Sequence, residues 1–203
     1  MDHRVLGVIG ASGGLGVSTL VVALAVRAAG RVGATVAVDG APGGGALDVT
    51  ACVEHVSGLR WADLGAAEGR IDGAALLREL PAEGPTRVLA GRGPAPPDAV
   101  VRAALSGLSE VCGLGVVDLG GSTRWAELCT DLLLVVGSTA RQLADGAGVA
   151  CVRRCLRPWT VARRGEALCC PAGNDRHLFR CSAGEPQRQG GDQIRRLQGE
   201  RQC

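Results

Sequence analysis

The segment with the clearest chemical pattern is Ala11–Thr19, which reads Ala-Ser-Gly-Gly-Leu-Gly-Val-Ser-Thr. Glycines let the backbone turn several N–H groups toward one anion, and the start of a helix adds partial positive charge. Ser18, in the first helical turn, can place its hydroxyl on a Mg²⁺ ion that accompanies a phosphate. The pattern predicts a phosphate-binding loop, and the alternative of a simple strand-to-helix turn stays open.

This loop lacks the cation that phosphate transfer needs. In a working phosphate loop a lysine directly precedes the serine and holds the β- and γ-phosphates. That position is Val17, and the chain has no lysine and no tyrosine, so all 22 basic residues are arginine. Catalysis of phosphoryl transfer depends on placed charge. We therefore expect weak nucleotide binding and little or no ATP hydrolysis.

Two aspartates follow apolar runs that are typical of buried strands. Asp39 ends Ala34–Asp39, and Asp118 lies near the end of Leu114–Leu119. In α/β folds, ligands bind at the carboxyl ends of parallel strands, so both carboxylates are candidates for the same site. The alternatives for each are a helix cap or a loop charge.

Strands and helices alternate along the first three quarters of the chain. Strands are expected at 4–10, 34–39, 86–90, 114–119 and 131–137, and helices at 17–30, 46–56, 72–80, 98–112 and 138–156. This order predicts an α/β fold with a mostly parallel sheet and helices on both faces.

The loop resembles the deviant phosphate loop of the MinD/ParA/CpaE superfamily of P-loop ATPases, Lys-Gly-Gly-x-Gly-Lys-Ser/Thr. The resemblance implies a P-loop NTPase-like domain that uses ATP and Mg²⁺. It implies a Mg²⁺ site at Ser18 and Asp118. The implied nucleotide-binding residues are Ser12, Gly13, Gly14, Leu15, Gly16, Val17, Ser18, Thr19 and Asp39.

Three residues depart from the family pattern. Ser12 stands where the family has a lysine that reaches across a dimer, and Val17 stands at the P-loop lysine. In the segment after Asp39, Ala41 replaces an aspartate that positions the attacking water in active members. CpaE-type members often carry a small residue at the position of Val17.

The segment Gly58-Leu59-Arg60-Trp61-Ala62-Asp63-Leu64, followed by Gly69-Arg70, resembles the actinobacterial CpaE-like septum site-determining (Ssd) group. This resemblance implies a cytoplasmic regulator of septum placement or of pilus and secretion-system positioning. Its implied partners are a second copy of the chain and proteins of those machineries, which would provide any membrane association.

A Rossmann-type dehydrogenase is the main rival, because Gly10–Gly16 also resembles the glycine turn of short-chain dehydrogenases. Those enzymes rely on a Tyr-x-x-x-Lys pair, and this chain has neither residue type. A non-catalytic NAD(P)-binding protein and a truncated, non-functional product remain open alternatives.

The composition changes near residue 151. Residues 1–150 carry 11 arginines and 15 acidic residues, whereas residues 151–203 carry 11 arginines, five acidic residues and six of the nine cysteines. We expect a P-loop NTPase-like domain at 1–156 and an irregular Arg/Cys-rich tail at 157–203 without strands, disordered or frame-shifted. The cysteine spacing matches no standard zinc pattern. Neither a specific nucleic-acid site nor a transmembrane segment is expected.

Overall fold

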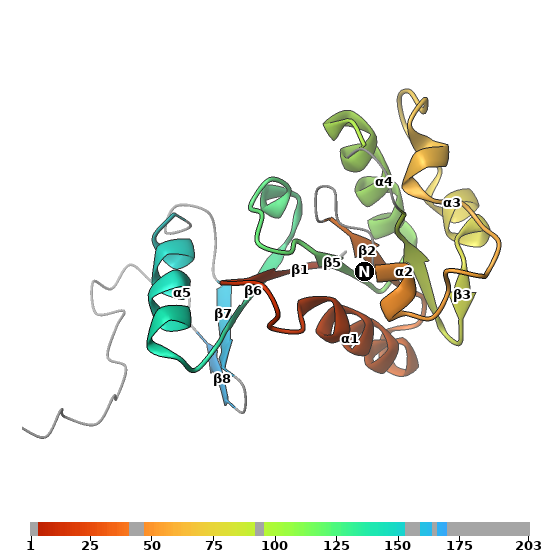
Figure 1. The fold of residues 1–203 in the computed structure, drawn as a ribbon. Coiled ribbons are helices and arrows are strands. Elements are labelled where there is room, and N and C mark those ends of the chain that lie inside the picture. Colours follow the sequence, from red (N-terminus) through yellow and green to blue (C-terminus); the bar gives the residue numbers. More distant parts are fainter. Residues whose placement is uncertain (1–3, 41–46, 92–95, 153–158, 164–165, 170–203) are drawn as a thin grey trace, which may run out of the picture. The chain divides into compact units, whose positions relative to one another are not determined.

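Short apolar runs form one sheet with the strand order β3-β4-β2-β5-β1-β6-β7-β8 (Figure 1). The computed structural model describes residues 4–40, 47–91, 96–152, 159–163 and 166–169. The strands are β1 Val5–Gly10, β2 Thr35–Asp39, β3 Ala82–Glu83, β4 Thr86–Leu89, β5 Leu114–Asp118, β6 Asp131–Val136, β7 Trp159–Arg163 and β8 Glu166–Cys169. The helices are α1 Val17–Val32, α2 Leu47–Thr50, α3 Gly73–Glu79, α4 Asp98–Val111 and α5 Ala140–Val152, with short 3₁₀ helices η1 Trp61–Leu64 and η2 Ala126–Leu128.

The inner strands β4, β2, β5, β1, β6 and β7 run parallel, and the edge strands β3 and β8 pair antiparallel with their neighbours. The five predicted strands correspond to β1, β2, β4, β5 and β6, so the predicted α/β class with a mostly parallel sheet is confirmed.

The expectation of no strand after residue 157 is wrong for β7 and β8. β7 pairs in parallel with β6, with Leu132 opposite Trp159 and Val136 opposite Arg163. Hydrogen bonding to the edge of an existing sheet stabilises a strand even where its own sequence has no strand-like periodicity. The sequence pattern therefore gave no indication of β7. Residues 170–203 lie outside the described residues, so the predicted tail stays a prediction there.

Alternate residues of the central strands face two separate apolar cores, as the two-residue period of a strand requires. Val36, Val38 and Val117 belong to the core beneath α3 and α4. Ala37 and Val116 belong to the core beneath α1. Figure 1 shows α1 on one face of the sheet and α3 and α4 on the other.

The first two strands of the chain are not neighbours, because β5 lies between β1 and β2. In Rossmann and flavodoxin-like folds the first two strands lie side by side. The observed order is therefore inconsistent with the predicted alternative of a Rossmann-type NAD(P)-binding domain. In the part of the chain that the structure describes, no helix is long and apolar enough to cross a membrane.

Candidate functional site

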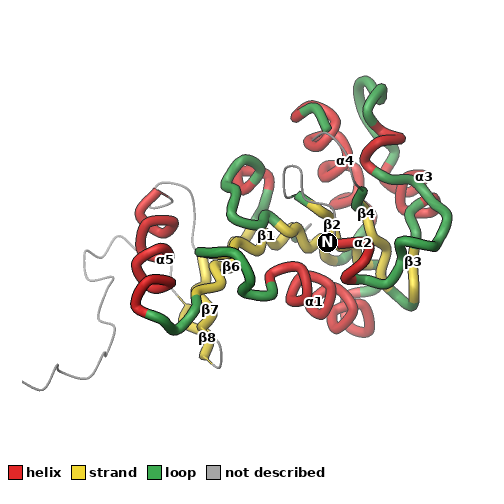
Figure 2. Tube along the Cα trace, in the orientation of Figure 1, coloured by secondary structure: helices red, strands yellow, loops and turns green. Residues whose placement is uncertain are grey.

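The predicted phosphate loop joins the end of β1 to the start of α1 (Figure 2). Gly14 and Gly16 have φ angles of 75° and 76°, a left-handed conformation that favours glycine. A Cβ added at Gly13, Gly14 or Gly16 would meet no atom of the described residues within 4 Å. Those residues therefore leave the space around this part of the loop open.

The base of the loop is fixed by main-chain hydrogen bonds, while five N–H groups further along it have no partner among the described residues. Gly10 N–H donates to Gly120 O at 2.7 Å, and Ala11 N–H donates to Val135 O at 2.9 Å. Gly16 caps α1 without any side-chain hydrogen bond. The N–H groups of Gly13, Gly14, Gly16, Val17 and Ser18 donate to no other described residue. Such groups at a helix start need an acceptor, and an anion is a suitable one.

Val17 turns its side chain into the protein. A Cβ added at Gly10 would lie 2.9 Å from Val17 Cγ2, so the valine packs directly over the end of β1. Val17 also contacts the core beneath α1. The structure thus brings the backbone of Val17 to the loop but leaves its side chain in apolar contact, where it offers an anion nothing.

Ser12 carries an unpaired polar atom. Its Oγ is buried and has no hydrogen-bond partner among the described residues. A buried hydroxyl without a partner loses free energy unless a further group satisfies it. Ser12 lies at the base of the loop, where the oxygen of a bound phosphate is one group that would satisfy its hydroxyl.

Asp39 and Asp118 are brought together at the carboxyl ends of β2 and β5. They are directly paired residues of adjacent parallel strands, and only 6% and 3% of their surfaces are exposed. Asp118 Oδ1 accepts a 2.8 Å hydrogen bond from Gly120 N–H. Within the described residues, no arginine forms an ion pair with Asp118.

A buried carboxylate at a strand end and a loop whose N–H groups have no described partner together fit a Mg²⁺–phosphate ligand. Burial of a carboxylate is unfavourable unless it is hydrogen-bonded or paired with a cation, and carboxylate and hydroxyl oxygens suit Mg²⁺. Asp118 and Ser18 are the residues that would hold the ion. Ala41, the third departure from the family pattern, lies outside the described residues.

Trp61 and Arg60 make tertiary hydrogen bonds that the sequence did not indicate. Trp61 Nε1 donates to the carbonyl oxygen of Asp39 at 2.8 Å. The Arg60 guanidinium donates to three main-chain carbonyls, those of Val53, Val56 and Gly58. An arginine followed by a tryptophan gives no local signal of such tertiary hydrogen bonds.

The strand order, the loop and the aspartates define a P-loop NTPase-like α/β fold, and solved structures share it. A ParA family ATPase from Chlorobium tepidum has a TM-score of 0.66 at 19% identity, covering 79% of this chain and 72% of that one. The MinC:MinD cell division protein complex of Aquifex aeolicus has a TM-score of 0.61 at 18% identity, and the match covers 79% of this chain and 68% of that one. MinD of Pyrococcus horikoshii, complexed with Mg-ADP, has a TM-score of 0.56 at 17% identity, and the match covers 77% of this chain and 68% of that one.

Two curated proteins of Mycobacterium tuberculosis are similar in sequence. The uncharacterized proteins MT3760, of strain CDC 1551, and Rv3660c, of strain H37Rv, are each 35% identical over 162 residues. The match covers 76% of this chain but only 45% of each relative. No family model matches the chain.

Proposed function

We propose that this chain is a CpaE/MinD-like regulatory protein that binds a nucleotide weakly through a degenerate phosphate loop and hydrolyses ATP slowly or not at all. Two observations carry the proposal: the N–H groups of Gly13, Gly14, Gly16, Val17 and Ser18 have no partner among the described residues, and the carboxylate of Asp118 is buried at the end of β5. The proposed nucleotide-binding residues are Ser12–Thr19 and Asp39, with Mg²⁺ held by Ser18 and Asp118.

The loop's own geometry favours binding over turnover. Backbone N–H groups and a helix start stabilise an anion that is already bound. Acceleration of phosphoryl transfer requires charges that neutralise the transition state. Because Val17 packs over Gly10, the loop keeps the backbone part of a phosphate site without its lysine.

We propose the biological role at the level of septum-site determination or the positioning of a pilus or secretion system. Support comes from the fold shared with a MinC:MinD cell division complex and from the segment at 58–64 that resembles the Ssd group. A homodimer and proteins of those machineries are the proposed partners, and any contact with the membrane would pass through them.

The test is a titration of the protein with ATP·Mg²⁺ and, separately, with NADPH, accompanied by a phosphate-release assay. The proposal predicts saturable ATP·Mg²⁺ binding, no NADPH binding and phosphate release close to the uncatalysed rate. Micromolar NADPH affinity without ATP binding would overturn the choice of ligand. Robust phosphate release would refute the argument from the missing lysines.

A further inference from the structure

We propose that Arg124 is the cation of the phosphate site, in place of the lysine that the loop lacks. This inference rests on the proposed function, because it assigns a binding residue to the same site. Arg124 belongs to the segment Leu119–Trp125, which follows Asp118 and connects β5 to η2.

The site requires a cation from elsewhere in the chain. A helix start supplies roughly half an elementary charge, whereas a nucleotide triphosphate carries several negative charges. Val17 contributes none, and the chain has no lysine. An arginine outside the loop is therefore the only permanently charged side chain that can meet the phosphates.

The segment that carries Arg124 contacts the base of the phosphate loop. Gly120 O accepts the 2.7 Å hydrogen bond from Gly10 N–H. A Cβ added at Gly121 would lie 3.9 Å from Gly10 O. Arg124 follows Gly121 by three residues, so their Cα atoms are at most about 11 Å apart. An extended arginine side chain crosses most of such a gap.

The chain that leaves β2 is held at both ends of this segment. Gly40 N–H donates at 2.7 Å to the carbonyl oxygen of Asp118, the residue that directly precedes the segment. A Cβ added at Gly40 would lie 3.3 Å from the Trp125 ring. Arg124 thus belongs to a short piece of chain that contacts both Gly10 at the end of β1 and Gly40 just after β2.

The present partners of Arg124 are easily exchanged. Its guanidinium pairs with Asp98 Oδ1 at 2.9 Å and lies 5.4 Å from the centre of the Trp125 ring. The two side chains of the ion pair are 42% and 55% exposed, and exposed ion pairs contribute little to stability. A phosphate offers the planar guanidinium two oxygens at once, the geometry that arginine binds best.

Other arginines at this end of the sheet are less suited. Arg60 already donates to three carbonyl oxygens. Arg141 is exposed at the start of α5, after β6, and is the competing assignment.

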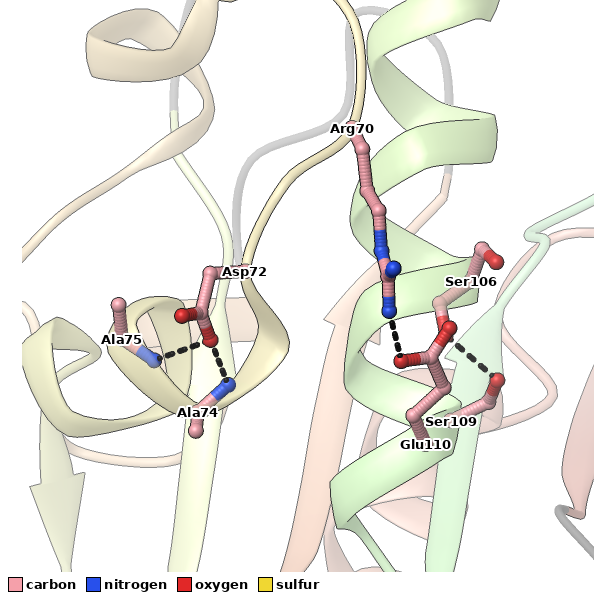
Figure 3. Close-up of polar contacts among 7 residues, drawn as sticks. All are labelled: Arg70, Asp72, Ala74, Ala75, Ser106, Ser109 and Glu110. Carbon is pink, nitrogen blue, oxygen red and sulfur yellow. Dashed lines mark hydrogen bonds and ion pairs between the residues drawn. The ribbon is translucent and has the colours of Figure 1, made fainter.

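Arg70 provides a control, because it pairs with Glu110 near the far end of α4, about 18 Å along the helix from Asp98. Figure 3 shows this pair, which provides a matched control for the loss of an exposed arginine.

The experiment measures the dissociation constant of the full chain for ATP·Mg²⁺, and for inorganic phosphate as a second probe, at constant ionic strength. Arg124→Ala should weaken binding about tenfold, and Arg124→Lys should recover most of the loss. Asp98→Asn should tighten binding severalfold, because the amide oxygen can still accept from Trp125 Nε1 while the competing charge is gone. Arg70→Ala should leave the affinity unchanged.

Opposite effects from the two members of one ion pair are the result that a merely structural role would not produce. If the wild-type protein binds ATP·Mg²⁺ and Arg124→Ala binds it equally well, the assignment of Arg124 is wrong, whereas the proposed function still stands. A loss with Arg141→Ala in place of Arg124→Ala would also overturn it. A wild-type protein that binds neither probe would contradict both proposals.

Discussion

Trp61 Nε1 donates a 2.8 Å hydrogen bond to the main-chain carbonyl oxygen of Asp39, the last residue of β2. The indole is 5% exposed and lies 6.4 Å, centre to centre, from the ring of Trp125. Trp125 in turn lies against Gly40. The strand end that presents Asp39 to the site is therefore supported from the side by two aromatic rings.

Replacement of this hydrogen bond should cost stability. Trp61→Phe leaves a buried carbonyl without its side-chain donor and creates a small cavity, so we expect the free energy of unfolding to fall by about 2–3 kcal/mol. Urea denaturation followed by circular dichroism measures the change. Trp125→Phe is the control and should cost less, because its indole N–H bonds to the exposed carboxylate of Asp98. Equal losses would contradict the role given to Trp61.

Gly10 is required by a close approach rather than by its backbone angles. In Gly10→Ala the new methyl would meet Val17 Cγ2 at 2.9 Å and Ser12 O at 3.2 Å. We expect a loss of about 1–3 kcal/mol in the free energy of unfolding. Gly13→Ala, where nothing lies within 4 Å, should change it by less than about 0.5 kcal/mol. A stable Gly10→Ala protein would mean that Val17 does not pack over β1.

Restoring the missing charge should improve binding. Val17→Lys can keep its aliphatic stem against Gly10 and extend its ammonium toward the loop. We expect affinity for ATP·Mg²⁺ to rise about tenfold, or about 1.4 kcal/mol. Calorimetric titration measures it, with Val17→Met as the uncharged control of similar length. Turnover should stay low, because Ser12 and Ala41 still depart from the pattern of active relatives. Unchanged affinity in both variants would argue against phosphate binding at this loop.

Asp72 gives the protein a pH-dependent helix cap. Its carboxylate accepts N–H bonds from Ala75 and Ala74 at the start of α3 (Figure 3), and these bonds lower its pKa from the ordinary 3.8. Because the pKa of Asp72 is lower in the folded state than in the unfolded state, its carboxylate stabilises the fold at pH values above the unfolded-state pKa. This stabilisation is lost as the pH falls through the folded-state pKa. Asp72→Ala should lower the melting temperature at pH 7, and its difference from wild type should shrink as the pH falls below 3.8 and the wild-type carboxyl becomes protonated. A difference that stays constant across the acid range would contradict this role of Asp72.

The alternation of apolar runs was enough to predict the central strands, because a parallel sheet covered on both faces needs continuous buried segments such as Val36–Val38. The local sequence pattern did not predict the lengths of elements that depend on tertiary contacts. The helix expected at 46–56 is only Leu47–Thr50, and Cys52 then takes a φ of 56° that ends helical geometry.

The position of the loop in the fold was predictable from the sequence, but the directions of its side chains were not. The types and spacing of Gly13, Gly14, Gly16 and Ser18 located the loop correctly between β1 and α1. No local pattern states that Val17 turns inward over Gly10, that Ser12 Oγ is buried without a partner, or that Arg124 pairs with Asp98. These depend on residues that lie far apart in the sequence.

The central claim is that the backbone N–H groups of the loop hold a phosphate. Amide chemical shifts followed by ¹H–¹⁵N NMR during titration with ATP·Mg²⁺ test it most directly. We expect the amide signals of Gly13, Gly14, Gly16 and Ser18 to shift progressively and saturate with one dissociation constant, while the signal of Gly84, in the turn between β3 and β4, stays in place. Saturable nucleotide binding that leaves these four loop amides unshifted would contradict it.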